Sequence, residues 1–345
     1  MELDNMTLRD NSSQTCPSID EFRNQVYSTV YSLITVFGLV GNGFAVLVLV
    51  QTKRQSSPFH VYMLNLAVSD LLCVSTLPLR VLYYVNKGQW NMGDFLCRIS
   101  SYALYVNLYC SIFFMTAMSV TRFIAIVFPV QNLRLVSQSR ARLVCVGIWV
   151  FICAVSSPFL MSGEYYDPDT NKTKCFEPPP RKDNDLSKLN MLNYFSLAVG
   201  FILPFLIILL CYAGIIRALL SRAQSSRCNR GSGSKAIRMI IIVALAFLLC
   251  FTPYHVQRSL HLSFLTRADT TCDEVVAMQK SVVVTLCLAA SNSCFDPLLY
   301  FFSGEGFRRR LSTMRKPTMV GNCRPQALPS LTENPEGENC QLKAH

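Results

Sequence analysis

Long apolar stretches alternate with short polar segments along this chain of 345 residues. A helix needs roughly 20 apolar residues to cross the hydrocarbon core of a membrane. Windows of that length with few charges lie at about 25–52, 60–86, 96–121, 143–162, 189–216, 237–260 and 278–302. No window alternates with the two-residue period of a strand in a membrane barrel. Because backbone polar groups in lipid must be bonded internally, the pattern predicts an all-α membrane protein with a bundle of seven transmembrane helices.

The same pattern divides the chain into four parts. A polar tail covers 1–24, the helical domain covers 25–302, and a polar tail at 317–345 is expected to be disordered. Between the helical domain and the second tail, "GEGFRRRLSTMRK" places apolar residues on one side of a helix and arginines on the other. This predicts a short amphipathic helix on the membrane surface at 303–316, with a solvated basic segment as the alternative. The first tail lacks the apolar core of a signal peptide, so the first span is expected to direct insertion.

Composition and charge support a membrane location and give an orientation. The chain is 51% hydrophobic and 15% charged, whereas about a quarter of an ordinary soluble domain is charged. The connection between the fifth and sixth spans contains no acidic residue but six basic ones, namely Arg217, Arg222, Arg227, Arg230, Lys235 and Arg238. Short cytoplasmic loops carry such an excess. We therefore expect a multi-pass plasma-membrane protein with an external N-terminus and a cytoplasmic C-terminus, and interpret the net charge of +11 as topology rather than nucleic-acid binding.

The external side carries the expected covalent modifications. Sequons for N-glycosylation lie at Asn5, Asn11 and Asn171. Four of the 15 cysteines are external, and only that side is oxidising. Four cysteines allow three pairings; the expected ones are Cys97–Cys175, which fixes the second external loop over the bundle, and Cys16–Cys272, which ties the tail to the third. Cys323 in the cytoplasmic tail is a palmitoylation candidate or a reduced thiol.

Two acids lie near the membrane midplane, Asp70 in the second span and Asp296 in the seventh. Charged groups there are costly and usually functional. Nearby polar candidates are Asn42, Ser111, Asn292 and Ser293. The set predicts a hydrated cluster that holds a shared proton or a cation, with sodium at Asp70 the metal considered; hydrogen bonding within the bundle alone is the alternative. No cofactor is expected.

Proline residues interrupt several spans. Pro297 directly follows Asp296 and removes a backbone donor, which predicts a bendable joint in the seventh span. Four further spans contain Pro78, Pro158, Pro204 and Pro253. Neighbouring helices or water can bond the freed backbone groups, so each kink is also compatible with static packing.

The outer halves of the spans carry cations and tyrosines. The candidate pocket residues are Arg80, Tyr105, Tyr109, Tyr254, Arg258 and His261. Arg258 and His261 are three apart on one helix face, and the first two tyrosines are four apart on another. Fixed cations among tyrosines favour an amphipathic ligand with carboxylates and a long apolar tail. The alternative for the arginines is snorkelling to the membrane interface.

Short motifs occur in order, one on each helix. They include "GN" at Gly41–Asn42, "NLAVSD" ending at Asp70, Arg122, "CFTPY" and "DPLLY". The set resembles the rhodopsin-like (class A) G-protein-coupled receptors. Longer blocks such as "YALYVNLYCSIFFMTAMS" and "KCFEPP" are similar to those of the cysteinyl leukotriene receptors within that family.

The resemblance implies a ligand, partners and site residues. It implies binding of cysteinyl leukotrienes by Arg80, Tyr105, Tyr109, Ser156, Tyr254, Arg258 and His261. It also implies signalling through a heterotrimeric G protein, expected to be Gq-type, to calcium release, with arrestin and receptor kinases as further partners. The activation residues that it implies are Arg122, Tyr212, Phe247, Phe251, Pro253, Pro297 and Tyr300.

The chain departs from the family in two activation motifs, at three positions. The stretch "SVTRFIA" places Thr121 and Phe123 beside Arg122, where the family has an acid and a tyrosine. The ionic lock of the resting state is therefore expected to be weak or absent, so packing or other contacts must hold that state. Phe251 replaces the usual tryptophan of the sixth span, and any aromatic toggle would use it with Phe247.

Other functions have less support. The sequence contains no Gly-rich phosphate loop and no metal-ligand spacing among its four histidines, so an enzyme is not expected. A nucleotide receptor would use the same arginines. An ion-coupled carrier would explain the paired acids, but it predicts internal repeats, and the two halves are not similar.

Overall fold

The computed structural model describes residues 16–51, 57–161, 163–168, 170–177, 185–225, 230–264 and 270–303. Seven helical segments of this part are long and apolar enough to cross a membrane: Asp20–Gln51, Pro58–Val85, Asp94–Val127, Gln138–Val155, Asn190–Ser221, Ala236–Phe264 and Cys272–Phe301. Each overlaps one predicted window, so the seven-helix prediction is confirmed. The amphipathic helix at 303–316, the tail at 317–345, Cys323, Asn5 and Asn11 lie outside the described residues, apart from Ser303.

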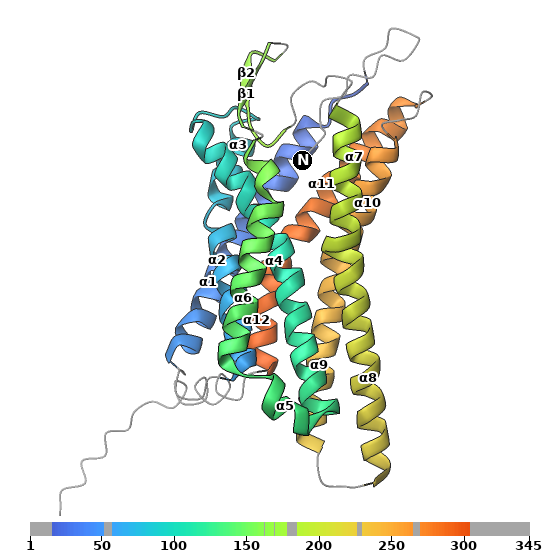
Figure 1. Cartoon of the computed structure of the whole chain (residues 1–345). Coiled ribbons are helices and arrows are strands. Elements are labelled where there is room, and N and C mark those ends of the chain that lie inside the picture. The colour runs from blue at the N-terminus through green and yellow to red at the C-terminus, as the bar shows by residue number, and fades with distance from the viewer. Residues whose placement is uncertain are drawn as a thin grey trace, which may run out of the picture.

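The helices form one elongated bundle, shown in Figure 1. Their bounds are α1 Asp20–Gln51, α2 Pro58–Val74, α3 Leu77–Val85, α4 Asp94–Val127, α5 Pro129–Leu135, α6 Gln138–Val155, α7 Asp185–Leu197, α8 Leu203–Ser225, α9 Arg230–Ala246, α10 Thr252–Phe264, α11 Cys272–Ala290 and α12 Asn292–Ser303. The long helix α4 contacts α2, α6 and α8. It therefore supplies side chains to sites along the whole bundle.

Proline positions coincide with irregular segments. The turn at Ser75 and Thr76 separates α2 from α3, whose first turn contains Pro78. π-Helical turns at Ala198–Ile202 and Phe247–Phe251 directly precede the segments with Pro204 and Pro253. Such turns absorb a helix irregularity without breaking the span.

The fourth span differs from its predicted window, which reached residue 162. The helix α6 ends at Val155, and a 3₁₀ helix follows at Ser157–Leu160. Pro158 lacks the N–H needed to continue the α-helical ladder. The window was therefore too long at its end, although its apolar character suggested otherwise.

A hairpin covers one end of the bundle (Figure 1). It consists of β1 Tyr165–Asp167 and β2 Lys172–Lys174, which pair antiparallel. The disulfide Cys97–Cys175 ties its second strand to the start of α4, and Cys16–Cys272 ties the chain before α1 to the start of α11. Both disulfide pairings are present in the structure as expected. We call this end the hairpin end and the other, which carries α5, the opposite end.

Candidate functional site

A polar group from α4 and α10 forms the first part of the predicted pocket. Arg258 Nη1 donates to the Tyr254 hydroxyl at 3.2 Å, and Tyr109 interacts electrostatically with the same guanidinium. The fold therefore brings Tyr109 of α4 to Tyr254 and Arg258, which are one turn apart on α10. His261 is buried one turn further along α10.

The Tyr109 ring is packed directly against a helix backbone. A Cβ atom at Gly200 would lie 2.7 Å from Tyr109 Cε1, so only glycine leaves room for the ring there. His255 presents its ring to the same tyrosine at 5.9 Å and stacks on Phe201 at 4.5 Å. Within the π-helical turn at 198–202, Gly200 therefore packs directly against the Tyr109 ring, and Phe201 supports it through His255.

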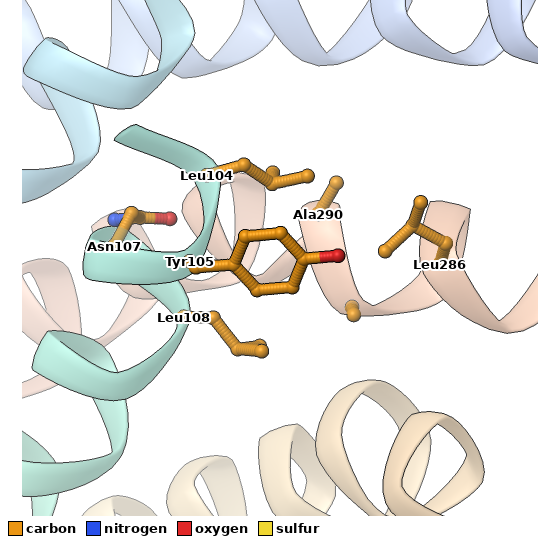
Figure 2. A pocket seen from close by; sticks show the side chains of 7 residues that line it. Leu104, Tyr105, Asn107, Leu108, Leu286 and Ala290 are labelled. Atoms are coloured by element: carbon orange, nitrogen blue, oxygen red, sulfur yellow. The ribbon is translucent and has the colours of Figure 1, made fainter. Parts of the chain in front are cut away.

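Tyr105 and Ser156 lie beside the end of the fourth span. The Tyr105 ring stacks on Phe159 at 3.7 Å. Ser156 is buried, and its hydroxyl has no hydrogen-bond partner among the described residues. Tyr105 also lines a small cavity with Leu286 and other side chains of α4 and α11, as Figure 2 shows. Its volume of about 10 Å³ is close to the space that one water needs.

Arg80 lies near the hairpin end, below the segment that follows β2. Its guanidinium carbon is 4.1 Å from the centre of the Phe176 ring, and the residue is only 3% exposed. Such burial argues against snorkelling to the membrane interface. The sequence indicated the position of this arginine in the span, but gave no signal for the phenylalanine that covers it.

The two midplane acids meet in the structure. Asp70 Oδ1 accepts hydrogen bonds from Asn107 Nδ2 at 2.8 Å and from Ser293 Oγ at 3.1 Å. Asp296 is fully buried and interacts with Asp70. Apart from this contact, neither carboxyl oxygen of Asp296 has a hydrogen-bond partner in the described part of the chain. Two carboxyls in contact need a proton or a cation between them, so the residues fit either the shared proton or the sodium expected above.

The membership of this polar cluster differs from the prediction in one residue. Asn292 Oδ1 lies 3.1 Å from Ser293 Oγ, where it competes with Asp70 Oδ1 for the one hydroxyl hydrogen, and so belongs to the cluster. Ser111 has no hydrogen-bond partner for its hydroxyl within the described residues, and Asn107, one turn earlier, bonds Asp70 instead. The two residues are four apart on one face of α4. The sequence therefore indicated which face of the helix points to Asp70, but not which turn of the helix reaches it.

Pro297 is accommodated by α1. Because proline has no N–H, the carbonyl of Ser293 loses its helical partner. Asn42 Nδ2 donates to that carbonyl at 2.8 Å. A Cβ atom at Gly41 would lie 2.8 Å from Pro297 Cγ, so the ring packs against the α1 backbone.

At the opposite end, Arg122 is covered by an aromatic ring. Its guanidinium carbon lies 4.0 Å from the centre of the Phe59 ring, and no acid forms an ion pair with it in the described ranges. Thr121 Oγ1 donates to the Ala117 carbonyl at 2.8 Å instead. The Phe123 ring packs so closely against Gly214 that a Cβ atom added to this glycine would clash with the ring.

Four further residues expected to act in activation, Tyr212, Phe247, Phe251 and Tyr300, are buried in the bundle. Tyr212 and Ser119 share a hydrogen bond at 3.0 Å. Phe247 and Phe251 meet edge to face at 5.2 Å in the π-helical turn before Pro253. Tyr300 is fully buried in α12.

Comparison with known proteins identifies the family. Residues 41–300 match the 7 transmembrane receptor (rhodopsin family). The chain belongs to this family. It is 61% identical over 317 residues to cysteinyl leukotriene receptor 1 of Cavia porcellus, covering 91% of this chain and 92% of that one. The identity to cysteinyl leukotriene receptor 1 of Homo sapiens is 60% over 320 residues, covering 92% and 93%. Cysteinyl leukotriene receptor 2 of Homo sapiens is 42% identical over 313 residues, covering 90% and 88%.

Membership of the rhodopsin family settles the class of protein. Since the family is one of receptors, the chain is a receptor and not an enzyme, and the ion-coupled carrier is dropped. The structure shows the surroundings of the positions at which this chain differs from the usual family motifs. Arg122 has an aromatic partner in place of an acid, and Phe251 sits against Phe247.

Proposed function

We propose that this chain is a plasma-membrane receptor for cysteinyl leukotrienes that signals through a heterotrimeric G protein. The observation that carries the proposal is the meeting of Arg258, Tyr254 and Tyr109 in an otherwise apolar bundle. Identity of about 60% to leukotriene receptors over nine tenths of the chain supports the ligand class.

The chemistry of the pocket suits such a ligand. A cysteinyl leukotriene is a fatty acid conjugated to a short peptide, so it combines carboxylates with a long apolar chain. Arg80 and Arg258 each offer a planar set of donors that can bond a carboxylate in two places. The rings of Tyr105, Tyr109 and Tyr254 offer apolar area together with a hydroxyl. We assign Ser156 and His261 to the same pocket as further polar contacts.

The orientation follows from the charge pattern. The excess of cations in the loops supports an orientation with the opposite end in the cytoplasm and the hairpin end outside. Asn171, exposed at the hairpin with φ of 53°, is then accessible for glycosylation. Gq-type coupling to calcium release, with arrestin and receptor kinases as later partners, belongs to the same proposal.

Radioligand competition on receptors at the cell surface tests the ligand site. Arg80→Ala and Arg258→Ala should each weaken a cysteinyl leukotriene by roughly thirtyfold, since leaving its carboxylate desolvated without a partner costs about 2 kcal/mol or more. Arg→Lys should restore only part of this. Lys280→Gln is the control, because Lys280 is exposed and only faces the Phe22 ring at 5.4 Å. Wild-type affinity in both arginine variants, with normal surface expression, would remove the anionic-ligand assignment.

A nucleotide receptor is the alternative within the family, because phosphates would bond the same arginines. Calcium release in transfected cells, with nucleotides and cysteinyl leukotrienes compared side by side, separates the two. We expect a response to the leukotrienes alone. A response to nucleotides alone would replace the proposed ligand while keeping the receptor assignment.

A further inference from the structure

The segment after β2 acts as a cover for Arg80, and it adopts an unusual backbone conformation. Phe176 has φ of 68°, a region that bulky residues rarely adopt. Its ring meets Tyr83 at 5.4 Å and Trp90 at 5.2 Å, both edge to face, and lies over the Arg80 guanidinium at 4.1 Å. Such a conformation persists only where the surroundings fix it.

The neighbour of Phe176 is a fully buried acid. The Glu177 side chain has 0% exposure, accepts a hydrogen bond from the Tyr83 hydroxyl at 2.8 Å, and forms ion pairs with Arg23 at 3.3 Å and Lys174 at 3.4 Å. These partners come from α3, α1 and β2. This buried acid is costly to disturb, because Arg23 and Lys174 would each lose a compensating charge.

The ion pairs continue outward from Glu177 on both sides. Arg23 also pairs with Asp20 at 2.7 Å, and Lys174 pairs with Asp167 at 2.9 Å. The result is an alternating row of acids and bases from the start of α1 to the hairpin, which we call the charge row. With the disulfide of Cys175 on the other side, the charge row holds Phe176 from both directions.

We propose that Phe176 and Glu177 are positioning residues for the ligand contact made by Arg80. Glu177 fixes the segment, and the Phe176 ring covers one face of the guanidinium, whose N–H groups point outward at its edge. Excluding water from that face strengthens a charged hydrogen bond made at the edge. The assignment rests on the proposed anionic ligand, but neither residue is required to touch it.

Binding of a tritiated cysteinyl leukotriene to receptors counted at the surface by an epitope tag tests this assignment. Phe176→Leu should lower affinity about tenfold, the order of a desolvated cation–π contact, whereas Phe176→Trp, which keeps an aromatic face, should stay within about threefold. Glu177→Gln, of nearly equal shape, should lower affinity in the same direction. Asp94→Asn is its matched control, since the ion pair of Asp94 with Arg98 is partly exposed, and the change should be within about twofold.

A double-mutant comparison separates positioning from direct contact. If Phe176 acts through Arg80, Phe176→Leu should cost less than about threefold in an Arg80→Ala receptor, yet keep its tenfold effect in an Arg258→Ala receptor. A tenfold loss in both backgrounds would overturn the assignment, and so would near wild-type affinity of Phe176→Leu alone. Absence of leukotriene binding by the wild type would overturn the proposed function and this assignment with it. Wild-type binding that Phe176→Leu leaves unchanged would overturn the assignment alone.

Discussion

The hydrogen bond from Asn42 to the carbonyl of Ser293 allows a direct measurement of how the bundle tolerates Pro297. We consider Asn42→Leu in two receptors, the wild type and Pro297→Ala. In the wild type, the carbonyl has no helical donor, and Asn42 Nδ2 supplies one at 2.8 Å. In Pro297→Ala, the new N–H at position 297 can donate to the same carbonyl.

The expected magnitude follows from what each bond satisfies. Asn42 Nδ2 also lies 3.1 Å from the Gly38 carbonyl, but that carbonyl is already the helical acceptor for the Asn42 N–H, so its loss is cheap. The Ser293 carbonyl is different, because a buried acceptor without a partner costs about 1–3 kcal/mol. Asn42→Leu should therefore destabilise the wild type by about 1–2 kcal/mol. In the Pro297→Ala receptor the cost should fall to less than half of this.

Thermal inactivation of ligand binding by the detergent-solubilised receptor provides the assay. A loss of 1–2 kcal/mol corresponds to a fall of about 2–6 °C in the midpoint temperature. Asn42→Leu should show this fall in the wild type and a clearly smaller one in Pro297→Ala. Equal falls in the two backgrounds would refute the idea that Asn42 replaces the donor that proline lacks.

Three further changes test other parts of the receptor. Phe59→Leu should raise basal second-messenger production and Phe59→Tyr should not, because the 4.0 Å stack on Arg122 needs an aromatic face; unchanged basal signalling in the leucine variant would contradict this. Gly200→Ala should lower agonist affinity about tenfold, since its Cβ would overlap the Tyr109 ring, while Gly147→Ala, with open space around its Cβ, should bind normally. Asp70→Asn should alter signalling more than agonist affinity; loss of binding with normal signalling would argue against the polar cluster.

The sequence was sufficient for the features that depend on one segment at a time. Apolar runs gave all seven spans, because length and hydropathy decide whether a helix can cross a membrane. Charge counting left only four cysteines on the external side, and both expected pairs formed. The predicted window of the fourth span extended beyond the end of α6. The prediction followed the apolar composition and did not take into account that Pro158 ends the α-helix.

Features that depend on contacts between segments were missed. Asn107 lies on the same face of α4 as Ser111, and the sequence cannot tell which of the two reaches Asp70. Glu177 lies in a loop that reads as solvated, yet it is buried through partners from three other elements. These arrangements arise from how helices are placed against one another, which the periodicity of a single helix does not encode.

The two covered arginines suggest a common solution to a charge in an apolar bundle. Arg80 at the hairpin end and Arg122 at the opposite end each lie over a phenylalanine at about 4 Å. A ring compensates part of the charge but covers only one face, and the N–H groups of a guanidinium point outward in its plane. An ion pair with an acid would instead occupy those N–H groups. We therefore expect Arg122, for which the described residues supply no ion pair, to accept a partner from the G protein without first breaking a salt bridge, and we expect the resting state to depend on packing around Phe59 and Phe123 rather than on ionic strength.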